Sequence, residues 1–219
     1  RWFVPQSRGG MVLLALWPVA LLFPAAVPFG LGQVLERLEG AVGEYLVDTP
    51  FLEWMPIRDS EWQPLAPGAE MLCVILGLLI PCLLGFCVIR QLARRAVFVL
   101  MTVAAGVMVS ALSAALSWGP LHAWAWISLP VQVGTAIAVV LALLLTFVPW
   151  RASAALLLLC LGIYLSLLNQ ASESAYFTQT LQAWEQGRFI RFHGHAQWLL
   201  WGWPYITVVY VLSLISQRD

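Results

Sequence analysis

Polar side chains that could bind a ligand are concentrated in residues 184–198, which hold two arginines and two histidines among aromatic residues. Arg188 and Arg191 are three positions apart, so in a helix their guanidinium groups lie on one face. Such a pair can bind a phosphate or a carboxylate through matched hydrogen bonds. The same arginines could instead pair with Glu185 and other acidic residues, or extend to lipid phosphates without a specific role. A ligand site and a purely architectural role both remain open.

His193 and His195 are two positions apart, and on a helix this spacing points their side chains in different directions. A zinc site would need further ligands from elsewhere in the fold, and the neighbouring sequence offers no cysteine. A single histidine could also ligate a porphyrin-type pigment. Because neither pattern is specific, we predict no metal site and no cofactor, and we assign only His193 to the candidate ligand site.

Tryptophan is unusually frequent, with 12 copies. Most of them fall near the ends of apolar segments, where membrane interfaces favour amphipathic rings. Trp198, Trp201 and Trp203 lie within six residues and could form a stacking surface for a lipid chain, a sugar or another subunit. The predicted ligand-binding residues are therefore Arg188, Arg191, His193, Trp198 and Trp201.

Other reactive side chains favour structural interpretations. All four cysteines fall in or near apolar segments and form no CxxC pair, which is typical of buried thiols: Cys73, Cys82, Cys87 and Cys160. Glu70 lies at the start of an apolar segment, where the helix dipole stabilises a carboxylate. Small residues around Ser110, Ser113 and Ser117 favour close helix packing. We find no catalytic triad, phosphate-binding glycine loop or carboxylate pair, and we predict no catalytic residues.

Composition sets the class of protein. Of 219 residues, 61% are hydrophobic and only 10% are charged, whereas soluble domains carry about 25% charged residues. The mean hydropathy is +0.85. Eleven basic and eleven acidic residues balance without a basic tract, which argues against nucleic-acid binding. Every basic residue is Arg, so lysine chemistry is excluded.

Apolar segments of about 20 residues predict transmembrane helices. The fold class is therefore all-α, a polytopic transmembrane helical bundle forming a single membrane domain over 1–219. Prolines 18, 24 and 28 interrupt the first segment, so we expect its second half to be kinked or irregular. The fifth segment is the shortest. The six predicted spans are 11–30, 69–89, 96–118, 127–148, 152–168 and 195–215.

Arginine placement predicts the orientation, because cytoplasmic loops are enriched in basic residues. With six spans, one side of the membrane holds seven arginines: Arg1, Arg8, Arg90, Arg94, Arg95, Arg151 and Arg218. That side should be the cytoplasm, and it should hold both termini. Apart from Glu70, we expect no acidic residue near a span and no buried charge, which argues against a proton-coupled transporter.

Two external loops, 32–68 and 169–194, hold most of the remaining polar sequence. The first predicts an amphipathic helix on the membrane surface, because Glu36, Glu39 and Glu44 can face water opposite an apolar stripe. An acidic polar face favours packing against the protein itself. The stripe consists of Val34, Leu35, Leu38, Val42, Tyr45 and Leu46.

The beginning of the chain allows two interpretations. Arg1 is not an initiator methionine, so the sequence could be the C-terminal part of a longer chain. The first apolar segment, with Arg8 before it, could also be a signal peptide. Its length favours a retained helix.

The sequence resembles the C-terminal, extra-span region of long bacterial VanZ-like membrane proteins, outside the VanZ core. The resemblance is carried by Tyr176-Phe177, by 184–194, by Gln197-Trp198 and by Trp203-Pro204-Tyr205, and also by 16–18 and 30–33. The Glu-Gln and Gly-Arg signature of the core itself is not recognisable before the first span. The resemblance implies a link to the bacterial cell envelope and to low-level glycopeptide resistance, without a defined reaction.

We therefore predict a bacterial inner-membrane, VanZ-like protein with a non-enzymatic envelope role that binds a lipid-linked anionic ligand at the external interface. Its partners would be membrane lipids and not nucleic acid. The alternative is an accessory subunit of a larger membrane complex, since few intramembrane charges and many interfacial aromatics suit protein packing. A third hypothesis, an enzyme acting on a lipid pyrophosphate, would need an external base such as His193, His195, Glu173 or Glu185.

Overall fold

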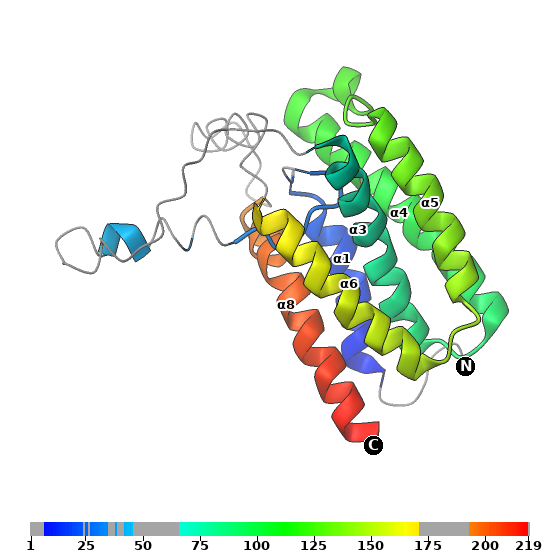
Figure 1. The fold of residues 1–219 in the computed structure, drawn as a ribbon. Helices are drawn as coiled ribbons and strands as arrows, with labels where there is room; N and C mark the ends of the chain where they lie inside the picture. Colours follow the sequence, from blue (N-terminus) through cyan, green and yellow to red (C-terminus); the bar gives the residue numbers. More distant parts are fainter. Residues whose placement is uncertain are drawn as a thin grey trace.

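A computed structural model describes residues 7–23, 25, 27–34, 38, 42–45, 66–170 and 193–218. In these ranges the regular secondary structure is helical and contains no strand, so the expected all-α class is confirmed. The long helices pack side by side as one bundle (Figure 1). They are α1 (Arg8–Ala20), α3 (Pro67–Val88), α4 (Leu92–Trp118), α5 (Leu129–Leu145), α6 (Trp150–Gln170) and α8 (His193–Arg218), with the short 3-10 helix η2 (Pro120–His122) between α4 and α5.

Four of the described helices are long and apolar enough to cross a membrane: α3, α4, and the stretches Trp150–Asn169 of α6 and Trp198–Gln217 of α8. The helices α1 and α5 are apolar but shorter, with 13 and 17 residues. The structure therefore supports a membrane protein, while the total of six spans stays a prediction. The fifth predicted span is not the shortest, because α6 extends over 21 residues.

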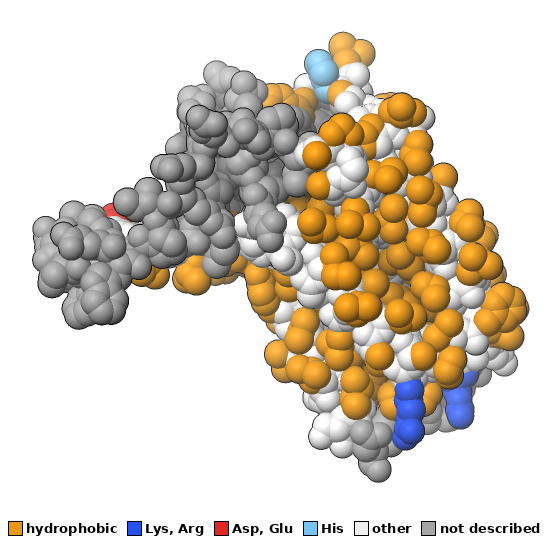
Figure 2. All heavy atoms as spheres, in the orientation of Figure 1, with side chains coloured by type: hydrophobic (Ala, Val, Ile, Leu, Met, Phe, Trp, Pro, Cys, Tyr) orange, Lys and Arg blue, Asp and Glu red, His pale blue; other side chains and the backbone are white. Residues whose placement is uncertain are grey.

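The helix α3 forms the centre of the bundle and contacts α1, α4, α5 and α6. From Cys73 to Val88 every residue is buried. This follows from a sequence that is apolar on all sides, because such a helix has no polar face to present to water. The surrounding helices bury one stripe and expose large apolar side chains outward, among them Leu100, Met108, Leu144 and Val209. Figure 2 shows this apolar outer surface, with basic side chains gathered at one end of the bundle.

Arg95 corrects the expectation that no charge is buried. It was predicted to lie between two spans, but α4 begins four residues earlier than expected and Arg95 is only 6% exposed. Its guanidinium donates to carbonyls at two helix ends. Nε and Nη2 bind the carbonyls of Ile89 and Phe86 at 2.8 and 2.7 Å, and Nη1 binds those of Thr146 and Val148 at 2.9 and 2.7 Å.

These four carbonyls explain why an arginine can be buried there. The last carbonyls of a helix lack partners within the helix, and hydrocarbon offers no water to satisfy them. Arg95 supplies donors to the C-terminal ends of both α3 and α5. Its charge therefore serves as a shared cap for two helices.

The first predicted span is broken, as its prolines indicated. The helix α1 ends at Ala20, and the described part of residues 21–34 is not helical but is largely buried, with Phe29 and Leu31 each only 2% exposed. We call residues 21–34 the unwound segment. Such a backbone is tolerated at membrane depth only where the protein itself satisfies its polar groups.

Side chains of α6 and α8 form hydrogen bonds with the backbone of the unwound segment. The Tyr164 hydroxyl donates to the carbonyl of Phe29 and accepts from the backbone N–H of Leu31 at 2.5 Å. The Asn169 amide oxygen accepts from Val34 N at 3.2 Å, and Tyr205 donates to the carbonyl of Gly32 at 3.1 Å. Three side chains thus fix the unwound segment against the bundle.

The external loops lie mostly outside the described residues. Within the predicted amphipathic helix, Leu38, Val42 and Tyr45 have helical backbone and are exposed, Tyr45 by 90%. The described residues therefore do not show the packing against the protein that the acidic face suggested, and the helix itself stays a prediction.

Candidate functional site

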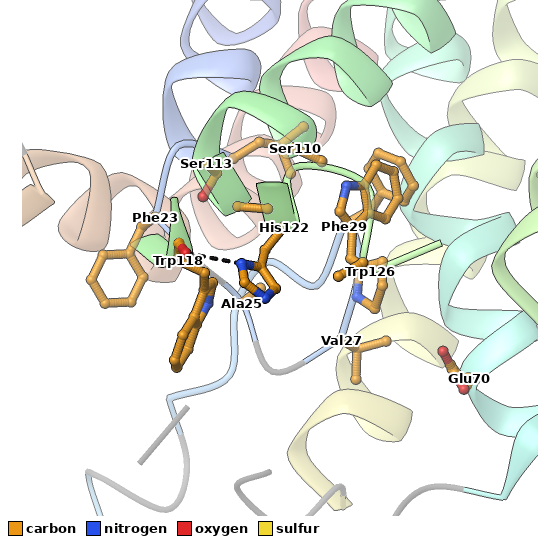
Figure 3. A pocket seen from close by; sticks show the side chains of 14 residues that line it. Phe23, Ala25, Val27, Phe29, Glu70, Ser110, Ser113, Trp118, His122 and Trp126 are labelled. Carbon is orange, nitrogen blue, oxygen red and sulfur yellow. Dashed lines mark hydrogen bonds between the residues drawn. The ribbon is translucent and has the colours of Figure 1, made fainter. Parts of the chain in front are cut away.

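A cavity of about 450 Å³ opens at the end of the bundle where α3 and α5 begin and α4 ends (Figure 3). The unwound segment, α3, α4 and the connection after α4 all contribute to its wall. The lining residues are Leu21, Phe23, Ala25, Val27, Pro28, Phe29, Glu70, Ser110, Ser113, Ala114, Trp118, His122, Ala125 and Trp126.

The unwound segment forms one wall because small residues of α4 allow it to approach closely. A Cβ added at Gly106 would lie only 2.8 Å from Trp17 Cη2 and 3.1 Å from Phe29 Cε1. About two helical turns further along α4, Ser113 donates its hydroxyl to the carbonyl of Leu22 at 2.7 Å. Space at Gly106 and a tether at Ser113 therefore hold the segment beside α4.

Aromatic rings form much of the wall. Phe29 and Trp126 meet edge to face, with ring centroids 5.7 Å apart and planes at 86°. The Trp126 indole N–H donates to the carbonyl of Ala123 at 2.9 Å, which fixes the ring to its own turn. In Figure 3 the rings of Phe29 and Trp126 lie on one side of His122, and those of Phe23 and Trp118 lie on the other.

Two ionisable side chains reach the cavity. Glu70 lies in the first turn of α3 and is half-buried, and Ser128 donates its hydroxyl to Glu70 Oε1 at 3.1 Å. Ser128 also caps α5, since its oxygen accepts from the backbone N–H of Val131 at 3.4 Å. The carboxylate is thus oriented by a chain of hydrogen bonds that joins the N-termini of two helices.

His122 is the second ionisable group. Its Nδ1 lies 3.1 Å from the carbonyl oxygen of Trp118. A carbonyl can only accept, so Nδ1 must carry a proton to form this bond, and in the neutral ring Nε2 is then an acceptor. The cavity therefore holds a carboxylate at one side and, separated from it by Val27 and Trp126 in Figure 3, a histidine whose tautomer the backbone selects.

The predicted ligand-binding residues are not part of this cavity. Arg188 and Arg191 lie outside the described residues, and for His193 only the helical backbone is described. Trp198 is 72% exposed, and its ring meets that of Trp201 edge to face at 5.5 Å. The expected three-tryptophan surface is wrong at Trp203, which is buried and donates its indole N–H to the carbonyl of Leu13 at 2.7 Å.

Sequence reasoning interpreted the cavity residues individually and in structural terms. Glu70 was interpreted as a helix cap, Ser113 as a packing residue, and Trp118 and Trp126 as interface aromatics. Glu70 lies in the first turn of α3 without a capping hydrogen bond, and Ser113 is packed against the unwound segment, whereas the interface position of the two tryptophans stays a prediction. None of these interpretations indicated that the residues meet. The one usable signal was the run of prolines in the first span, because a broken span implies a protein-lined space beside it.

The described residues include no group of three His, Cys, Asp or Glu side chains placed to hold a metal ion. All four cysteines are free thiols, three of them buried and Cys160 half-buried. No family model, curated protein or solved structure matches the chain.

Proposed function

We propose that this protein is a non-enzymatic membrane protein that binds a membrane amphiphile in the cavity beside the unwound segment. The observation that carries the proposal is the cavity itself, a space of about 450 Å³ with apolar and aromatic walls and a few polar groups. Binding sites for small molecules have this character. Broken helices at membrane depth also characteristically line binding sites.

The proposal extends to the cellular setting through the VanZ-like resemblance and the arginine distribution. We propose a bacterial inner-membrane protein with a cell-envelope role, both termini in the cytoplasm and the cavity at the external face. Arg95 caps the C-terminal ends of α3 and α5, and the cavity lies at the opposite, N-terminal ends of the same helices. Basic side chains gather at one end of the bundle in Figure 2. Both observations support this orientation, because basic residues are enriched on the cytoplasmic side.

The lipid-linked anionic ligand is a separate part of the proposal. It rests on Arg188 and Arg191, and its test is their joint substitution by Gln. We expect the double variant to keep its thermal stability and to lose co-purifying anionic lipid. Unchanged lipid content would contradict this part and leave the cavity proposal standing.

The cavity proposal is tested by filling the cavity from α4. Ala114 is buried and lines the cavity, whereas Ala104 is exposed on the same helix, away from the lining. We expect Ala114→Phe to lose tightly held lipid in native mass spectrometry of gently extracted protein, while Ala104→Phe and the wild type retain it. If Ala114→Phe does not fold, Ser110→Phe serves as the second filling variant. A filled variant that retains the same lipid adducts would overturn the proposal.

The alternative, an accessory subunit of a larger membrane complex, is favoured by a second hollow on the outer side of α6. This hollow contains Gly162 and Ser166, small residues four positions apart, and no atom approaches within 4 Å of a Cβ built at Gly162. Small residues at this spacing permit close approach of another helix. Native mass spectrometry distinguishes the two, because a subunit would appear in a defined mass several-fold above 24.3 kDa.

A further inference from the structure

Three polar side chains of the cavity, Glu70, His122 and Ser113, present hydrogen-bond acceptors, whereas the Ser110 hydroxyl and the Trp118 indole N–H are donors on the α4 wall. Ionised Glu70 has about four acceptor positions, and the hydroxyl of Ser128 occupies one of them. Neutral His122 presents Nε2 as an acceptor, because Nδ1 is bound to the carbonyl of Trp118. The Ser113 hydroxyl has already donated its proton to Leu22, so its oxygen also can only accept.

The donor of Trp126 is likewise engaged, because its indole N–H binds the carbonyl of Ala123. The described lining residues include no Arg, and the chain has no Lys. A ligand that brings its own hydrogen-bond donors is therefore satisfied by this cavity. An anionic group would meet a carboxylate and would find few donors among the side chains that line it.

Charge and aromatic faces favour the same chemistry. Glu70 contributes a negative charge in a half-buried position, where screening by water is reduced. The cavity wall carries Phe23, Phe29, Trp118 and Trp126. Aromatic rings attract cations electrostatically through their π faces, and tryptophan does so most strongly. A carboxylate at one side of a cavity with aromatic walls is a combination that favours ammonium groups (Figure 3).

We propose that the amphiphile bound in this cavity carries an ammonium headgroup that Glu70 recognises, as in phosphatidylethanolamine. This inference rests on the proposed function and specifies the ligand class of the same site. The ammonium donates hydrogen bonds to the Glu70 carboxylate, and the acyl chains of the lipid follow the apolar wall. Glu70 contacts the ligand directly, and Ser128 positions Glu70.

The test measures headgroup preference in the full chain with Arg188 and Arg191 both replaced by Gln, so that anionic lipid held at that proposed site is not counted. The protein is placed in nanodiscs with equal amounts of phosphatidylethanolamine, phosphatidylcholine and phosphatidylglycerol, all with the same acyl chains, and the last retained lipid is identified by native mass spectrometry. We expect phosphatidylethanolamine to be enriched at least tenfold over phosphatidylglycerol, a preference of about 1.4 kcal/mol that one charge-assisted hydrogen bond can supply. Phosphatidylcholine should rank between them, because its ammonium has charge but no N–H.

The matched variants are Glu70→Gln and Glu44→Gln. Glutamine keeps the shape of the side chain and an oxygen that can accept from Ser128, but it removes the charge. We expect Glu70→Gln to abolish the enrichment while its melting temperature stays near that of the wild type, and Glu70→Asp to restore part of it. Glu44 is exposed and does not line the cavity, so Glu44→Gln should keep the full preference.

The outcomes separate this inference from the proposed function. Retention of lipid without headgroup preference, preference for phosphatidylglycerol, or equal loss in Glu44→Gln would overturn the ammonium site while leaving amphiphile binding intact. A wild-type protein that retains no lipid in native mass spectrometry would overturn the proposed function itself. Preference for phosphatidylethanolamine that Glu70→Gln abolishes supports both.

Discussion

Substitution of Arg95 provides a quantitative test of the fold, because this one side chain donates hydrogen bonds to four carbonyls at the ends of α3 and α5. In Arg95→Met the side chain keeps its apolar character near Cβ and loses every donor. Each buried acceptor left without a partner costs about 1–3 kcal/mol. Surrounding hydrocarbon cannot supply a replacement.

The loss is partly offset because the variant no longer buries a guanidinium. That burial costs about 2.5–3.5 kcal/mol at the bilayer centre and less toward its surface, and Arg95 lies in the first turn of α4. With four acceptors left unpaired the loss exceeds this offset, and we expect Arg95→Met to lower the free energy of unfolding by at least about 2 kcal/mol. The stability of Arg95→Lys should fall between those of Arg95→Met and the wild type, because a lysine ammonium cannot reach four acceptors as the planar guanidinium does.

The assay is thermal unfolding in one detergent at one scan rate, followed by tryptophan fluorescence. For a chain of this size, each kcal/mol shifts the melting temperature by about 2–4 °C, so Arg95→Met should melt at least about 4 °C below the wild type. Arg90→Met is the matched control, because Arg90 is exposed. Equal melting temperatures for Arg95→Met and Arg90→Met would refute the role of Arg95 as a shared cap.

Two further substitutions test the contacts that hold the unwound segment. Gly106→Val should destabilise the protein by about 1–3 kcal/mol, because the valine side chain would collide with Trp17. The control Gly162→Val places its side chain in open space and should leave the melting temperature unchanged. Equal effects of the two substitutions would contradict the packing argument. Tyr164→Phe removes a hydroxyl that binds one carbonyl and one N–H of the segment, so a loss of about 1–3 kcal/mol is expected, whereas Tyr45→Phe at an exposed position should be silent in the same melts.

The amino-acid sequence alone determined the class of the protein. Low charge and long apolar segments indicate a helical membrane protein. Only an apolar environment such as lipid can surround so many outward-facing Leu, Val and Met side chains. It also indicated that the second half of the first predicted span is irregular, since prolines oppose helix continuation, although α1 continues past Pro18 and ends at Ala20. These properties are local, and a window of about 20 residues carries them.

Burial of Arg95 was decided by the tertiary structure. In the sequence Arg95 follows Arg90 and Arg94 and resembles any basic flank of a span. Only packing brings the ends of α3 and α5 within reach of one guanidinium, and their carbonyls are what make burial of the charge tolerable. The same holds for Trp203, whose indole finds its acceptor on Leu13, 190 positions away.

The candidate site was also decided by tertiary packing. Phe29, Glu70, Ser113 and His122 come from four separate parts of the chain, and no spacing in the sequence relates them. The hydrogen bonds of Glu70 and Ser113 depend on neighbours brought close by folding, Ser128 and Leu22, whereas His122 bonds the carbonyl of Trp118 four residues before it. The composition therefore determines that the protein folds in a membrane. The chemistry of its cavity depends on the tertiary packing, which decides which helix ends meet there.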